Sequence, residues 1–88
     1  MKAKKDFLLK KMADEYILVP IGEENMHFNG LVRLNASGAW LWEQLAEDIT
    51  ADALIQRMCV RYEGLDEATA ARDLQEFLQS VKPALEAE

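Results

Sequence analysis

The chain has 88 residues, of which 50% are hydrophobic and 30% are charged, and its formal net charge is −6. This length holds a single domain, with an expected ordered core of residues 7–82, and the composition excludes a disordered tail. Half of the lysine and arginine residues lie in residues 1–11, which leaves the rest of the chain acidic enough to repel a phosphate backbone. We therefore expect no nucleic-acid partner.

Three strands are expected in the first part of the chain. Residues 7–12 form the first, and Ala13-Asp14-Glu15 is a plausible tight connection into the second, residues 16–21, which is rich in β-branched and aromatic side chains. A turn at residues 22–25 then leads to the third strand, residues 26–34.

The third strand contains two conflicting signals. Asn29-Gly30 between apolar residues is typical of a hairpin turn, which would split residues 26–34 into two strands. Two strands of about three residues would be only marginally stable, and we favour one continuous strand in which Gly30 is a packing or bulge position.

Three helices follow, and each begins at a residue that can cap it. Asn35, Thr50 and Asp66 have side-chain oxygens that accept a hydrogen bond from a backbone N–H in the first turn. Gly64 ends the second helix and Pro83 marks the end of the third. Apolar residues at three- and four-residue spacing predict the buried faces: Leu41, Trp42, Leu45 and Ile49 in the first helix; Leu54, Ile55, Met58, Cys59 and Tyr62 in the second; Ala70, Leu74, Phe77, Leu78 and Val81 in the third.

This order of elements predicts an α+β fold, a three-stranded antiparallel sheet followed by three helices, with a winged helix-turn-helix-like arrangement. We expect the lysine-rich N-terminal residues to be solvated and residues 84–88 to fray. The apolar run Phe7-Leu8-Leu9 is far too short for a signal peptide or a membrane span, so we expect a cytoplasmic protein with no membrane partner.

The residue types needed for catalysis or metal binding are scarce. His27 and Cys59 are the single histidine and the single cysteine, and Cys59 lies on an apolar helical face that disfavours a reactive thiolate. One histidine and one cysteine cannot supply a zinc site, and the four glycines form no phosphate-binding loop. We therefore expect a protein that is not an enzyme, with no catalytic residues, no metal and no cofactor.

A motif spans the end of the third strand and the first helix, where Leu34-Asn35, Ser37-Gly38-Ala39 and Leu41-Trp42 are followed by Leu45. It resembles the core motif of the PqqD family, small peptide-binding proteins of ribosomal-peptide maturation that have the winged helix-turn-helix plan. The resemblance covers roughly residues 7–82. The chain departs from the family at residues 82–88, which lack the apolar wing segment that commonly follows the third helix.

The resemblance implies a function and a site. In PqqD-like domains, the leader segment of a precursor peptide adds as a strand beside the third strand, in a cleft walled by the third helix. The implied peptide-binding residues are Phe28, Asn29, Gly30, Leu31, Val32 and Arg33 on the strand and Ala71, Arg72, Leu74, Gln75 and Leu78 on the helix. The four-residue spacing of Leu74 and Leu78 is more typical of core residues than of ligand contacts, and whether they line the groove stays open. The implied role is that of a peptide chaperone, which presents the leader to a radical-SAM maturation enzyme without catalysing any step.

A second hypothesis belongs to a different class. The same fold could serve as an acidic adaptor or regulatory module that acts through protein contacts or as a homodimer, so both monomer and homodimer stay open. A transcriptional regulator is less favoured, because the candidate recognition helix carries Asp66, Glu67, Asp73 and Glu76.

Overall fold

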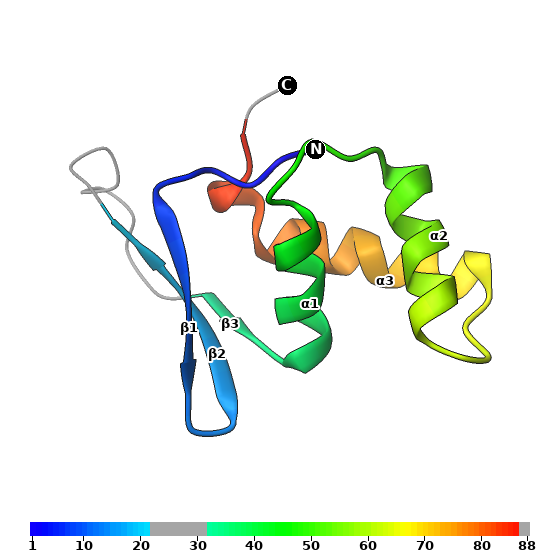
Figure 1. Ribbon diagram of the computed structural model, residues 1–88, viewed down its shortest axis with the longest axis horizontal. Coiled ribbons are helices and arrows are strands. Elements are labelled where there is room, and N and C mark those ends of the chain that lie inside the picture. The colour runs from blue at the N-terminus through cyan, green and yellow to red at the C-terminus, as the bar shows by residue number, and fades with distance from the viewer. Residues whose placement is uncertain (22–31, 87–88) are drawn as a thin grey trace.

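The computed structural model describes residues 1–21 and 32–86. Within these ranges the chain forms the predicted α+β fold, a three-stranded antiparallel sheet followed by three helices (Figure 1). The elements are β1 (Phe7–Met12), β2 (Glu15–Pro20), β3 (Val32–Leu34), α1 (Ala36–Gln44), α2 (Ala51–Arg61), α3 (Glu67–Ser80) and the short 3-10 helix η2 (Lys82–Ala84).

The sheet has the order β1-β2-β3, and both strand pairs are antiparallel. Met12 pairs with Glu15, so the hairpin turn consists of Ala13 and Asp14, with Ala13 in the left-handed region at φ 55°. β1 has the predicted bounds, whereas β2 begins and ends one residue earlier than predicted. Only residues 32–34 of the predicted third strand are described, and the question of a turn at Asn29-Gly30 lies outside the described residues.

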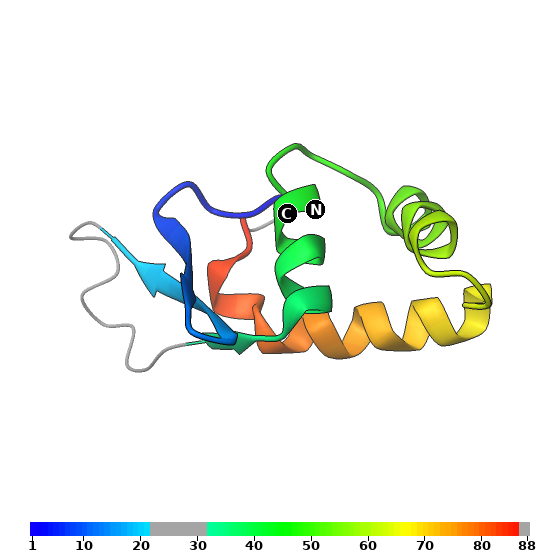
Figure 2. The same cartoon turned by 60° about the horizontal axis from the view of Figure 1, so that its bottom comes forward.

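The sheet occupies one end of the molecule, and α1 stands between it and α2, while α3 runs along the helical part towards the sheet (Figures 1 and 2). One core joins these parts, because its fully buried side chains come from the sheet and from all three helical segments. They are Leu18, Leu45, Leu54, Leu74 and Val81. Among the described helices, none combines the length and apolar character that a membrane crossing needs.

All three predicted helix caps are confirmed. Asn35 Oδ1 accepts a hydrogen bond from Gly38 N at 2.8 Å, Thr50 Oγ1 from Ala53 N at 3.1 Å, and Asp66 Oδ1 from Thr69 N at 2.7 Å. Each bond satisfies a backbone N–H that has no partner within its own helix, and it fixes where the helix begins. The bond from Thr69 N to Asp66 also lowers the pKa of the Asp66 carboxyl.

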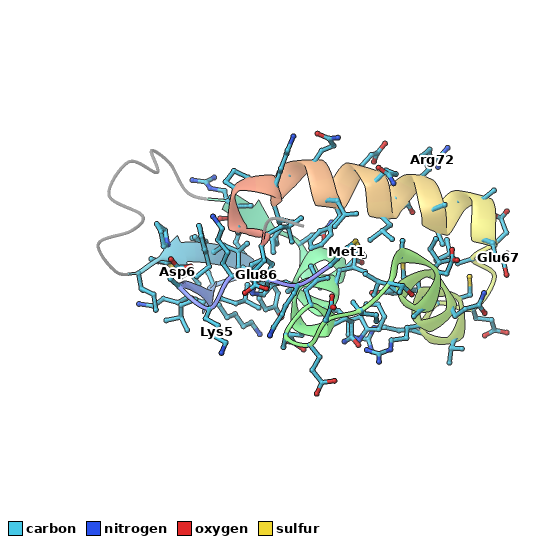
Figure 3. The ribbon with its side chains drawn as sticks, turned by 90° about the horizontal axis from the view of Figure 1, so that it is seen from above. Met1, Lys5, Asp6, Glu67, Arg72 and Glu86 are labelled. Atoms are coloured by element: carbon cyan, nitrogen blue, oxygen red, sulfur yellow. The ribbon has the colours of Figure 1, made fainter. Side chains whose placement is uncertain are left out.

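The two ends of the described chain lie side by side. Ala3 and Leu85 form a β-bridge, flanked by hydrogen bonds from Lys4 N to Ala84 O at 2.8 Å and from Glu86 N to Lys2 O at 2.9 Å. Figure 3 shows Glu86 close to the N-terminal segment. The expectation that residues 84–86 fray was therefore wrong, whereas Lys5, Lys10 and Lys11 are exposed, as expected of solvated lysines. Pairing between segments so far apart in sequence leaves no periodic signal, and Ala84 is buried in the core.

Candidate functional site

β3 lies at an edge of the sheet. In the part of the chain that the structure describes, its residues 32–34 pair with residues 16–18 of β2, and β3 has no strand on its other side. The paired chain ends run elsewhere, because residues 84–86 bond to residues 2–4. An edge strand presents a row of N–H and C=O groups that can pair with another extended segment. The opposite edge, β1, carries Lys10 and Lys11, the kind of residue that protects an edge from pairing.

A cleft of about 670 Å³ opens beside the end of β3. It lies between the β3–α1 junction and α3, and residues of the turn that follows α2 also line it. Its lining residues come from four places along the chain: Arg33, Leu34 and Asn35; Ser37, Gly38 and Leu41; Met58, Tyr62, Glu63, Gly64 and Leu65; and Asp73, Glu76, Phe77 and Ser80.

The floor of the cleft is apolar. Leu34, Leu41, Met58 and Phe77 all line it, and all four are buried members of the hydrophobic core. Because their positions are fixed by core packing, the floor is a preformed surface that an apolar side chain can cover without rearrangement of the domain.

The α3 wall of the cleft is acidic. Asp73 and Glu76 lie one turn apart on α3 and both line the cleft, as does Glu63 in the turn that follows α2. Arg33 is the cation among the described lining residues. Its side chain is 72% exposed and lies 4.0 Å from Glu15, a contact that solvent screens strongly.

Aromatic and basic side chains pack together beside the cleft, where α2 ends. The rings of Trp40 and Tyr62 meet edge to face with centroids 5.9 Å apart, and the Arg61 guanidinium lies 5.0 Å and 5.6 Å from the two ring centroids. A hydrogen bond with Ser37, on α1, lowers the pKa of the Tyr62 hydroxyl, and Arg61 adds to this effect. These contacts tie the end of α2 to α1 and keep this wall in place.

The structure brings part of the predicted strand side to the cleft. Arg33 lines it, Val32 is half-buried on the same short strand, and Phe28, Asn29, Gly30 and Leu31 lie outside the described residues.

The predicted helix-side residues lie on other faces of α3. Leu74 is 1% exposed and belongs to the core, Ala71 and Leu78 are half-buried, and Arg72 and Gln75 are exposed. Figure 3 shows Arg72 on the side of α3 that faces away from the other helices. None of these five is among the cleft-lining residues that the structure describes, so their role in peptide binding stays a prediction of the resemblance.

Sequence reasoning did not assign to the peptide site the α3 residues that do line the cleft. Asp73, Glu76, Phe77 and Ser80 follow the spacing i, i+3, i+4 and i+7, which places them along one face of the helix beside the buried stripe. That pattern was visible in the sequence. Which side of the stripe faces β3, however, depends on how α3 rotates against the core, and local periodicity does not contain that information.

The described residues offer no group of three or more histidine, cysteine, aspartate or glutamate side chains arranged to hold a metal ion. Cys59 is half-buried on α2. Within residues 1–21 and 32–86, the arrangement that the structure provides is a strand edge without a further strand, beside a cleft with an apolar floor, which suits an extended peptide.

Comparisons with known proteins agree with this geometry. A family model described as "Coenzyme PQQ synthesis protein D (PqqD)" matches residues 15–82, the stretch that holds β2, β3 and all three α-helices. A solved structure described as "TbiB1 in Complex with the TbiA(beta) Leader Peptide" is similar to the whole chain, with a TM-score of 0.75 and 26% sequence identity over 100% of this chain and 98% of that one. No curated protein sequence gives a significant match.

Proposed function

Because the chain belongs to the PqqD family, whose model matches well over half of it, we propose that it binds the leader segment of a ribosomally made precursor peptide. The similar solved structure is that of a protein in complex with a leader peptide, which supports this proposal. The protein acts as a non-catalytic chaperone, and it supplies affinity and position to the peptide.

The observation that carries the proposal is the edge of β3 beside the cleft. A leader in extended conformation adds to β3 as a further strand, and its backbone N–H and C=O groups bond to those of the edge. Alternate side chains of an added strand point to the same face, so every second leader residue turns towards α3 and the apolar floor. Backbone pairing then gives affinity, and the cleft gives selectivity.

The proposed benefit of leader binding is a higher effective concentration of the peptide at its enzyme. A leader held by a protein that also docks on a maturation enzyme meets that enzyme in a quasi-intramolecular step. The partner implied by the resemblance is a radical-SAM enzyme. Co-purification of the protein with a candidate radical-SAM enzyme, in the presence and absence of a leader peptide, tests this part of the proposal separately.

Leader binding is tested by NMR titration of the isotopically labelled protein. The probe is the leader of any short precursor peptide found encoded near its gene, and a scrambled peptide of the same composition is the control. We expect amide shifts in residues 32–34 and along the cleft face of α3, and no shifts with the scrambled peptide. If a large excess of the leader leaves these amides in place, the proposal is wrong.

A homodimer formed through β3 would occupy the same edge. Light scattering combined with the titration separates the two cases, because such a dimer must dissociate before a leader can pair with β3. A stable dimer that neither dissociates nor binds the leader would favour the adaptor hypothesis.

A further inference from the structure

We propose that the cleft selects leaders in which a lysine or arginine faces the α3 wall, two positions from a large apolar residue that covers the floor. This inference rests on the proposed function, and it adds the chemical character of the peptide that the site accepts.

The first observation is the balance of charge in the cleft. Its described lining contains three carboxylates, Asp73, Glu76 and Glu63, and one guanidinium, that of Arg33. Arg33 belongs to the strand side of the cleft, whereas Asp73 and Glu76 both belong to α3. A peptide strand between these walls therefore meets negative charge on the helix side, where its cleft-facing side chains point.

The second observation is that these carboxylates have few partners within the protein. Among the described residues, the side chains of Glu63 and Glu76 take part in no ion pair. Asp73 lies 3.8 Å from Arg72, its neighbour in sequence, but the Arg72 side chain is 71% exposed and adjacent residues on a helix do not face each other. A basic side chain of the ligand would thus meet acceptors that are still available.

The third observation is the position of the carboxylates relative to the floor. Glu76 is adjacent to Phe77 in sequence, and Asp73 lies one turn before Phe77 on the same side of α3. One helical turn rises about 5.4 Å, and same-face residues of a strand are about 6.6 Å apart. An extended peptide can therefore place one side chain over Phe77 and Leu41 while the side chain two positions away reaches a carboxylate.

Exposed apolar side chains outside the cleft do not identify a ligand. Val60, on α2, is strongly exposed, and Leu8 and Met12 are exposed on β1, but nothing in the structure shows what covers these side chains. The cleft differs from these side chains because the neighbouring strand edge, the apolar floor and the acidic wall all fit one kind of ligand, an extended peptide with a basic and an apolar side chain.

The test selects peptides from a display library of random sequences on the immobilised full-length chain. Three proteins are compared: the wild type, the double variant Asp73→Asn/Glu76→Gln, and the control Glu43→Gln/Glu47→Gln. The two variants lose the same charge, but Glu43 and Glu47 are exposed residues outside the cleft lining. All substituted side chains are exposed, and a thermal melt verifies that each protein folds.

We expect the wild type and the control to enrich peptides with a basic residue two positions from a large apolar one, and the cleft variant to lose the basic preference. A selected peptide should bind the cleft variant about three- to tenfold more weakly than the wild type in low salt, with a smaller difference in high salt. The control variant should stay within about twofold of the wild type. Replacing the basic residue of the peptide by glutamate should weaken binding to the wild type, and Asp73→Lys should restore it.

The possible failures have different meanings. If all three proteins enrich peptides with the same content of lysine and arginine, the inference about charge is wrong. It is also wrong if none of them enriches basic residues. In both cases the proposal that the protein binds peptides is retained. If the wild type enriches no peptide above background, both the inference and the proposed function are contradicted.

Discussion

Leu74 and Leu78 on α3 allow a test of which face of this helix contacts a peptide. Leu74 is 1% exposed and enclosed by the core, whereas Leu78 is half-buried and packs against the edge of the core. The resemblance implies that both contact the peptide, but the cleft face of α3 carries Phe77 instead. The variants Leu74→Ala, Leu78→Ala and Phe77→Leu therefore have different expected effects on stability and on binding.

The expected cost in stability follows from burial. Leu74→Ala removes fully enclosed atoms and leaves a cavity, which lowers the free energy of unfolding by about 2–5 kcal/mol. A domain of this size has a total stability of roughly 4–13 kcal/mol, so this loss is a large fraction. Leu78→Ala gives up only part of the same apolar area, because the side chain already contacts water, and it should cost about 1 kcal/mol.

The expected effect on binding is largest for Phe77→Leu, because only this side chain of the three is in the described cleft lining. Phe77→Leu removes the aromatic ring from the cleft floor, and the loss of about 1 kcal/mol of contact weakens leader binding about fivefold. At a temperature where all variants are folded, Leu74→Ala and Leu78→Ala should bind the leader within about twofold of the wild type, since neither side chain is in the described cleft lining.

Urea unfolding, followed by the tryptophan fluorescence of the buried Trp42 and the partly buried Trp40, measures the stabilities, and fluorescence polarisation with a labelled leader measures the affinities. Weaker binding by Leu78→Ala than by Phe77→Leu, with both proteins folded, would refute this reasoning. The peptide would then lie against the face of α3 that the resemblance implies, and the cleft beside Arg33 would not be the binding site.

Two further predictions concern the helix caps. Asn35→Ala should lower the free energy of unfolding by about 1 kcal/mol, because Gly38 N loses its acceptor, while Asn35→Ser keeps an acceptor and should cost clearly less in a thermal melt. Asp66 has a lowered pKa in the folded state, so its stabilising effect is fully present above the ordinary aspartate pKa of about 3.9 and is lost as the pH falls through the folded-state value. Asp66→Asn should therefore show a shallower loss of stability than the wild type below about pH 4, and parallel curves from urea unfolding across this range would contradict the assignment.

Local chemistry accounts for what could be predicted from the sequence. The caps at Asn35, Thr50 and Asp66 were predictable because the side-chain acceptor and the N–H that it satisfies are three residues apart. Most of the buried stripes were predictable for the same reason, since three- and four-residue spacing already defines one face of a helix. Ile49 is buried as expected, but it lies beyond α1, which ends at Gln44.

The parts that were not predictable depend on contacts between distant residues. The bridge between Ala3 and Leu85 joins segments more than eighty residues apart, and neither segment has a pattern that marks it as a strand. To predict the cleft wall, one has to know how α3 is oriented about its own axis. This orientation determines that Asp73 and Glu76 line the cleft and that Leu78 does not. The family resemblance, applied residue by residue, did not reveal this orientation of α3 either.

The bridge between Ala3 and Leu85 also offers a way to re-engineer the chain. Since the two ends of the described chain already lie together, a short flexible linker could connect them, and new ends could be opened at the exposed hairpin turn of Ala13 and Asp14. Such a circular permutant would keep β3, α1 and α3 contiguous. A reporter domain fused at the new ends would then be attached to the sheet at the turn between β1 and β2.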